Sequence, residues 1–176
     1  MKIIEAMKKL KDLTRKAADL RAKISSYCAD LDTDTPTYKT EDDQRTQIKG
    51  WLQGHHDITR EIENIRVSLT KTNCTLEVPI EMADGKTVTK TIQAWILRRR
   101  ELSRMDLEAW KGLTNRGLKD QAFRAQANAE EVKIAHVRRY YDQEDRDKKV
   151  ELYMAEPARI DAALEVFNAT TELVEV

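Results

Sequence analysis

Arginines beside aromatic residues are the side chains of this sequence best suited to chemistry. Arg98–Arg100 are consecutive, and Arg138 and Arg139 stand directly before Tyr140. Guanidinium groups bind phosphate and stack on aromatic rings, so these residues could hold a nucleotide or line a nucleic-acid groove. A helix spreads three consecutive arginines around its circumference, however, so all three cannot meet one phosphate. We favour ion pairs with the abundant Asp and Glu, and keep as anion-binding candidates Arg98, Arg99, Arg100, Arg138, Arg139 and Tyr140.

The adjacent histidines His55 and His56 resemble a metal site only superficially. Helical zinc sites place two histidines four residues apart on one face, whereas adjacent helical residues point about 100° apart. His136 is remote in the sequence, and no carboxylate spacing near the pair completes a ligand set. We therefore predict no metal site, and interpret His55 as a core or interface residue.

No known catalytic pattern accompanies the nucleophilic residues. Cys28 and Cys74 have no identifiable base, and Ser25–Ser26 lacks the glycines of a nucleophile elbow. Neither a dinucleotide-binding glycine motif nor a phosphate-binding loop is present among the five glycines. We predict a protein that is not an enzyme and needs no cofactor.

The composition narrows the functional class further. The 176 residues include 31 basic and 31 acidic side chains, and 35% are charged against 40% hydrophobic. Neutrality argues against a dedicated nucleic-acid binder, and the high charge favours thin helical structures or subunits that share a core. No signal peptide and no apolar run of about 20 residues is apparent. We expect a cytoplasmic protein, in the host or a virion if phage-encoded, without membrane contact.

Two long amphipathic helices account for the first part of the chain. Apolar residues recur every three or four positions from Ile3 to Leu31, and again from Ile48 to Leu69. The sequence Asp32–Pro36 separates them, and Thr40 is a good N-cap for the second helix. This pattern predicts an antiparallel helical hairpin over residues 1–72, about 40 Å long.

The pattern then changes to strict alternation. Leu76, Val78, Ile80 and Met82 alternate with polar residues and Pro79, which predicts a strand with one buried face. The next residues predict a hairpin at 73–91, with a two-residue turn at Asp84-Gly85, a return strand at Lys86–Lys90 and Pro79 facing outward from an edge.

Residues 92–176 complete the same domain in this interpretation. A helix capped by Thr89 or Thr91 carries an apolar face from Ile92 to Leu113, and a weak helix is expected at Gln121–Ala129. A second β-hairpin pairs Val132–Tyr141 with Val150–Met154 through an exposed connection, and a last helix begins at Pro157. The predicted fold class is mainly α with β-hairpin insertions (α+β), in which the long antiparallel helical hairpin packs with a third helix and two β-hairpins.

Several stretches together suggest a family. They are Thr72-Asn73, Asp84–Thr87 leading into Leu97–Leu102, and the ending Glu156–Leu173. On these stretches the sequence resembles a group of uncharacterised helical-hairpin proteins of bacteria and their phages, some of which are labelled septicolysin-like. The resemblance covers most of the chain, transfers no established reaction, and implies a phage or prophage setting.

The leading expectation is a non-enzymatic structural or interaction protein that forms a homo-oligomer in a phage virion or assembly, with other phage structural proteins as further partners. The interface candidates are Trp51, His55, Leu76, Val78 and Ile80. One alternative is a protein that binds or sequesters a small nucleotide-type ligand through the arginines and Tyr140. A weaker alternative is nucleic-acid contact through the same arginine and tyrosine patch.

Overall fold

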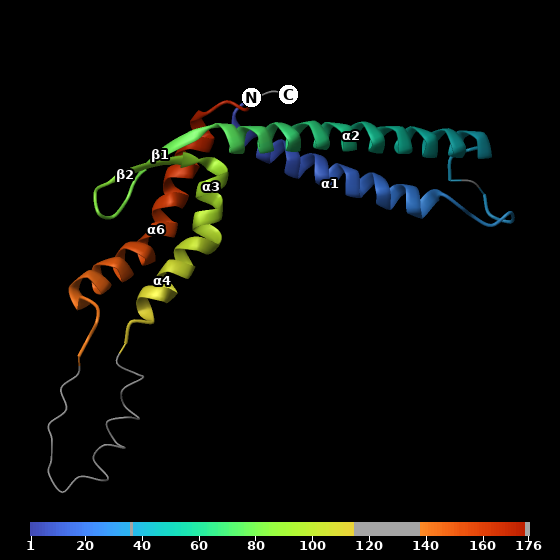
Figure 1. The fold of residues 1–176 in the computed structure, drawn as a ribbon. Coiled ribbons are helices and arrows are strands. Elements are labelled where there is room, and N and C mark those ends of the chain that lie inside the picture. Colours follow the sequence, from blue (N-terminus) through green and yellow to red (C-terminus); the bar gives the residue numbers. More distant parts are fainter. Residues whose placement is uncertain (36, 115–137, 175–176) are drawn as a thin grey trace, which may run out of the picture. The chain divides into compact units, whose positions relative to one another are not determined.

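The computed structural model describes residues 1–35, 37–114 and 138–174. The described residues are mainly helical and contain a two-stranded antiparallel sheet, which confirms the coarse fold class expected from the sequence (Figure 1). The chain forms two compact units, Met1–Leu76 with Glu165–Val176, and Glu77–Leu164. The predicted packing of the helical hairpin on a third helix stays a prediction.

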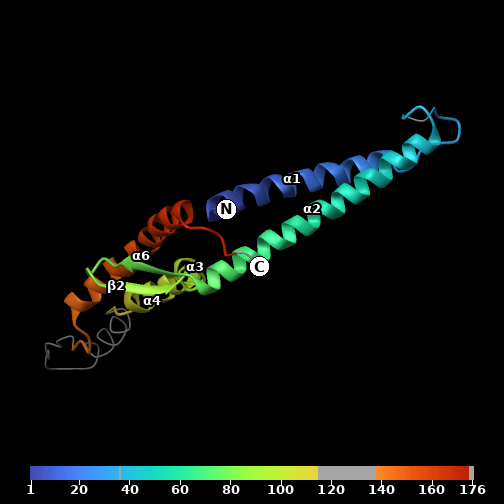
Figure 2. The same cartoon turned by 90° about the horizontal axis from the view of Figure 1, so that it is seen from above.

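Two helices dominate the first unit. Helix α1 spans Ile3–Tyr27 and helix α2 spans Glu41–Thr75, and the two lie side by side with the chain reversing between them (Figures 1 and 2). Lys9 of α1 forms an ion pair with Glu61 of α2. The Thr40 hydroxyl accepts a hydrogen bond from the Asp43 N–H at 3.2 Å, so Thr40 is the N-cap that the sequence predicts.

The first helix ends earlier than its apolar pattern predicts. It stops at Tyr27, and Leu31 is 68% exposed in the following loop. A continued helix would use the Tyr27 carbonyl to accept the Leu31 N–H. Instead, the side-chain amide of Gln44 donates to that carbonyl at 3.1 Å, and Gln44 is itself buried. The Gln44 side chain therefore takes the hydrogen bond that the next turn of α1 would form.

The C-terminal tail is hydrogen-bonded to the N-terminus within the first unit. The Ile3 N–H donates to the Thr171 carbonyl at 3.0 Å, and the Leu173 N–H donates to the Met1 carbonyl at 2.8 Å. The Val174 N–H donates to the buried Thr72 hydroxyl of α2 at 2.9 Å. Both ends of the chain therefore pack beside the same end of the helix pair, which we call the base (Figure 2).

The second unit begins with the β-hairpin. Strand β1 (Glu77–Glu81) pairs with β2 (Thr87–Thr91), and Ile80 lies opposite Val88. Val78, Ile80 and Met82 are all buried, as the alternating pattern predicts. The Met82 N–H donates to the Lys86 carbonyl across the hairpin. Because successive residues of a strand point their N–H groups to opposite sides, Pro79 faces the outer edge, where its lack of an N–H costs no hydrogen bond of the ladder.

The hairpin turn has three residues rather than the two predicted. The Gly85 N–H donates to the Met82 carbonyl at 3.0 Å, and Gly85 has a φ of 78°. A two-residue turn of the expected type needs positive φ at Asp84 as well as Gly85, and Asp84 does not have it. Instead, Ala83 and Asp84 form an ordinary turn and Gly85 alone adopts the left-handed conformation.

The helix after the hairpin contains a π-helical turn. Helix α3 (Ile92–Leu97) starts at Thr91, whose hydroxyl accepts the Ala94 N–H at 3.2 Å. The π-helical turn spans Arg98–Leu102, and helix α4 follows at Ser103–Lys111. The wider turn rotates the downstream residues, and Met105, predicted on the apolar face, is 60% exposed.

The predicted second β-hairpin is wrong in the part that the structure describes. Helix α6 runs from Gln143 to Thr170, so Val150–Met154 is helical and Pro157 lies inside a helix rather than at its start. The Asp142 carboxylate accepts the Glu144 N–H at 2.7 Å and thereby starts the helix much earlier. Residues 132–137 of the predicted strand and the weak helix at Gln121–Ala129 lie outside the described residues.

Candidate functional site

Arg98 lies at the centre of a buried polar network in the second unit. Its Nε donates to Glu156 of α6 at 2.8 Å, and one of its terminal nitrogens contacts the Asp106 carboxylate of α4 at 2.7 Å. The guanidinium carbon also stands 5.4 Å from the centre of the Tyr153 ring. With a side chain only 16% exposed, Arg98 has two carboxylates and one aromatic face as partners.

The π-helical turn brings Ser103 into the same network. The Ser103 N–H donates to the Arg98 carbonyl, the five-residue spacing that defines a π-helix, and its hydroxyl lies 2.9 Å from that carbonyl. The same hydroxyl is 2.7 Å from the second oxygen of Glu156, whose side chain is 3% exposed. Both carboxylate oxygens of Glu156 are therefore satisfied although the residue is buried.

This arrangement makes Arg98 a structural residue. Its hydrogen bond to Glu156 raises the pKa of the guanidinium above its usual value, against the lowering effect of burial. Arg99 forms an ion pair with Asp161 of α6, while Arg100 is exposed. Two of the three consecutive arginines are thus neutralised within their own unit, as the ion-pair interpretation of the sequence expects.

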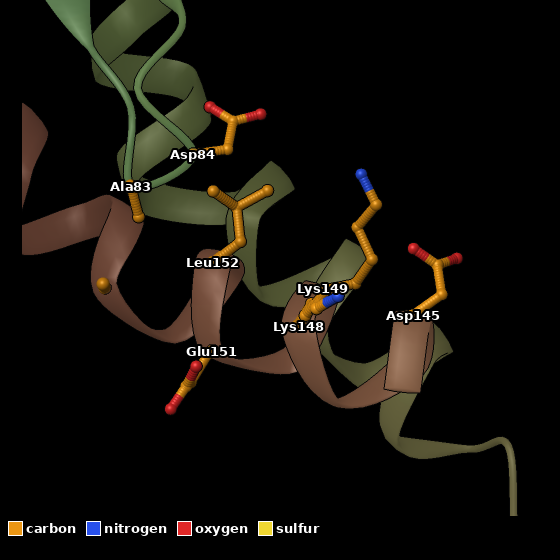
Figure 3. A pocket seen from close by; sticks show the side chains of 8 residues that line it. Ala83, Asp84, Asp145, Lys148, Lys149, Glu151 and Leu152 are labelled. Atoms are coloured by element: carbon orange, nitrogen blue, oxygen red, sulfur yellow. The ribbon is translucent and has the colours of Figure 1, made fainter. Parts of the chain in front are cut away.

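The cavities beside the hairpin turn carry charges of both signs. One, of about 280 Å³, includes Lys86, Lys90, Arg98 and Glu156 among its lining residues. The other, of about 470 Å³, lies between the turn and α6, where Leu152 points toward the turn and Glu151 points away from it (Figure 3). Since acidic groups line both cavities, neither presents a positive pocket for an anion.

The other predicted arginine cluster adjoins a separate cavity. Arg138–Tyr141 line a space of about 370 Å³ together with Gly112, Leu113 and Thr114. None of these lining residues is acidic, and Tyr140 is 89% exposed. Arg98–Arg100 are not among them, so the six anion candidates from the sequence do not share one cavity.

In the first unit, the apolar contact between α1 and α2 is open to solvent. No apolar side chain is buried in α1 after Leu13 or in α2 before Ile65. The buried apolar residues of this unit are Ile3, Ala6, Leu13, Ile65 and Leu173. The remaining apolar residues between the helices are half-buried. We call this set the seam: Leu10, Ala17, Leu20, Ile24, Ile48, Ile58, Ile62 and Leu69.

An aromatic cluster, which we call the tip cluster, lies where α1 ends and the loop to α2 begins. The Tyr27 and Trp51 ring centres are 5.7 Å apart, and Tyr38 lies 6.1 Å from Tyr27 and 5.9 Å from Trp51. All three residues are half-buried. The sequence singled out Trp51 but not Tyr38, because a loop residue belongs to no helical pattern.

The other interface candidates fall in different environments. His55 is half-buried on α2 and Leu76 is half-buried at its end, whereas Val78 and Ile80 are only 4% and 3% exposed. Within residues 1–35, 37–114 and 138–174, no group of three histidine, cysteine or acidic residues could hold a metal ion. None of the described helices is long and apolar enough to cross a membrane.

Comparison with known proteins shows only the fold. No family model matches the chain, and no curated protein matches it. The structure is similar to the crystal structure of a functionally unknown conserved protein from Corynebacterium diphtheriae, with a TM-score of 0.53 and 18% identity over 98% of both chains. This similarity assigns no activity.

Proposed function

We propose that the protein is a non-enzymatic interaction protein that assembles with copies of itself through the α1–α2 helical hairpin. The observation that carries this proposal is the seam, which stays half-buried along most of the two helices. Each helix of an isolated pair has a single neighbour, so water reaches the seam from both sides. A second layer of helices would remove it from water, and that burial is the main favourable term in association.

The dimensions of the hairpin fit such an interface. A helix of the length of α1 spans about 40 Å, and two adjacent helices are about 20 Å wide. One face of the pair therefore offers about 800 Å², which is the area that each partner contributes to a stable interface of ordinary size. We further propose a phage or prophage assembly as the setting, which the resemblance of the sequence supports.

The test is the oligomeric state of seam variants, measured by native mass spectrometry and sedimentation velocity. We expect a defined oligomer for the native protein and its dissociation in Ile58→Ser, which places a hydroxyl on the half-buried seam. Met105→Ser is the matched control, because Met105 is an exposed apolar residue of the second unit. Circular dichroism must show equal helix content in both variants. A native protein that stays monomeric at high concentration would contradict the proposal.

A second candidate function is the binding of a small anionic ligand at Arg138–Tyr141. It is favoured by the cavity of about 370 Å³ whose described lining residues include two arginines and two tyrosines. Calorimetric titration with ADP tests it, and Arg138→Glu should abolish the binding, whereas Arg104→Glu on α4 should not. Single-stranded DNA is the corresponding probe for nucleic-acid contact, whose affinity must fall steeply with added salt.

A further inference from the structure

The first unit has its charges separated along the hairpin. Residues 2–23 contain eight lysines and arginines against three acidic residues. Residues 28–43, which connect α1 to α2 and begin α2, contain six acidic residues against one lysine. We call residues 28–43 the tip. One end of the hairpin is therefore acidic, and the helix leading to it is basic.

Most of these charges have no opposite charge beside them. Within the described residues, no ion pair forms at Lys8, Lys11, Lys16, Arg21 or Lys23 of α1. The same holds for Asp30, Asp32, Asp34 and Asp43 of the tip, although Asp30 accepts a hydrogen bond from Gln44 and Asp43 accepts one from Thr40. These groups remain available to an oppositely charged partner.

One side of the helix pair combines apolar surface with positive charge. Residues seven apart lie on the same side of a helix. Met7 and Arg21 of α1, and Leu52 and Arg66 of α2, flank the seam on the side away from the Lys9–Glu61 ion pair. Met7 and Leu52 are each 52% exposed. We call this side the open face.

We propose that two copies of the chain pair antiparallel through their open faces, so that the acidic tip of each copy lies on the base-side half of the other hairpin, where α1 carries Lys8, Lys9 and Lys11. This inference rests on the proposed self-assembly and adds the partner's orientation. The arrangement has twofold symmetry, and each tip contact therefore occurs twice. The tip cluster would supply aromatic side chains at both ends of the interface, where such residues are enriched.

Charge decides between the two possible orientations. In a parallel pair, the six acidic residues of one tip would face the six of the other, and like charges in contact suppress an association. In the antiparallel pair, each tip meets α1 of the other copy. Individual exposed ion pairs contribute only about 0–1 kcal/mol, so the seam supplies affinity and the charges set the orientation.

The two cysteines allow this orientation to be measured directly. Cys28 follows α1 at the tip and Cys74 lies near the base end of α2, and both are exposed. A Cys74→Ser chain carries a single spin label at Cys28. In the antiparallel dimer the two labels stand about a helix length apart, about 40 Å, and in a parallel dimer they stand about 20 Å apart or less.

Each result of this pulsed electron-resonance measurement has a distinct meaning. A distance near the helix length supports the antiparallel dimer. A short distance overturns the orientation but leaves self-assembly standing. A monomeric protein, with no intermolecular distance, overturns both the orientation and the proposed function.

Charge exchange provides an independent test. Asp32→Lys with Asp34→Lys reverses two charges of the tip, and Lys11→Glu with Arg66→Glu reverses two charges of the base-side half. Each double variant alone should show at least a tenfold weaker dimer, because the exchanged residues at both tip contacts then face like charges. An equimolar mixture of the two should recover a heterodimer near native affinity, since both contacts become attractive again. Failure of the mixture to recover while each variant remains folded would overturn the antiparallel pairing.

Discussion

The two compact units of this chain bury their side chains in different ways. In the second unit, Trp95 is 1% exposed, and the buried Glu156 has a hydrogen-bond partner for each oxygen. In the first unit, two long helices leave the eight seam residues half-buried. The second unit pairs the buried charges of Arg98 and Glu156 with each other, whereas the first leaves an apolar stripe that another chain could cover. The half-buried stripe of the first unit can therefore contribute to binding, whereas the buried groups of the second unit contribute to its own stability.

The largest expected effect is a loss of stability in the second unit. Glu156→Leu removes the partner of the buried Arg98 and should lower the free energy of unfolding by about 3 kcal/mol. Urea denaturation followed by tryptophan fluorescence measures it. Glu108→Leu is the control, because Glu108 pairs with Arg104 on the surface and its removal should cost less than about 1 kcal/mol. Equal effects of the two variants would show that the buried network does not stabilise the unit.

The next effect concerns the bond between Trp95 and the hairpin. The indole N–H of Trp95 donates to the Val78 carbonyl at 2.8 Å. Trp95→Phe removes this bond and leaves a smaller ring in the core, and should cost about 2 kcal/mol. Trp110→Phe removes an indole of a half-buried residue and should cost clearly less in the same denaturation experiment. A larger loss in Trp110→Phe would contradict the assignment of Trp95 to the centre of this core.

A change in protein concentration should alter the stability of the first unit and leave that of the second unit unchanged. If the first unit dimerises, a tenfold rise in concentration adds about 1.4 kcal/mol per dimer to its stability and nothing to the second unit. Trp51 reports on the first unit and Trp95 on the second, so chains that retain one or the other tryptophan follow each unit in thermal unfolding. A transition at Trp51 that is independent of concentration would remove the proposed difference between the units.

A smaller effect is expected at the contact between the tail and α2. Thr72→Val removes the hydroxyl that accepts the Val174 N–H and should destabilise the first unit by about 1 kcal/mol. Thr70→Val is a close control. Both hydroxyls donate to the carbonyl one turn back, Thr72 to Ser68 and Thr70 to Arg66, but Thr70 is exposed. Hydrogen exchange at residues 171–174 should accelerate only in the Thr72 variant.

The smallest effect is a gain in stability. Gly50 lies within α2, and a Cβ there would have no heavy atom within 4 Å. Gly50→Ala should therefore stabilise the first unit by about 0.5–1 kcal/mol through helix propensity alone. At Gly85, where φ is 78°, the same substitution should destabilise the hairpin. The two variants can be compared directly by thermal denaturation.

The sequence predicted features that depend on neighbouring residues and missed those set by distant ones. Thr40 and the buried Val78, Ile80 and Met82 follow from local capping and alternation. The end of α1 at Tyr27 depends on Gln44, which is 17 residues away. No local pattern contains such a contact, so the helix was expected to continue to Leu31.

The same distinction explains the errors in the second unit. The alternation at Val150–Met154 covers only five residues, too few to distinguish a strand from a helix. The π-helical turn depends on Ser103 and Arg98 meeting Glu156, which lies more than 50 residues later. The sequence therefore identified Arg98 as important but could not assign its carboxylate partner.

The order of the two units along the chain has a consequence for synthesis on the ribosome. The second unit, Glu77–Leu164, is continuous in the sequence, whereas the first needs both Met1–Leu76 and Glu165–Val176. Domains fold as their residues emerge, from the N-terminus onward. Although α1 and α2 emerge first, the base of their hairpin cannot close until the segment around Leu173 has left the ribosome. The first unit can therefore be completed only after every residue of the second unit has been synthesised.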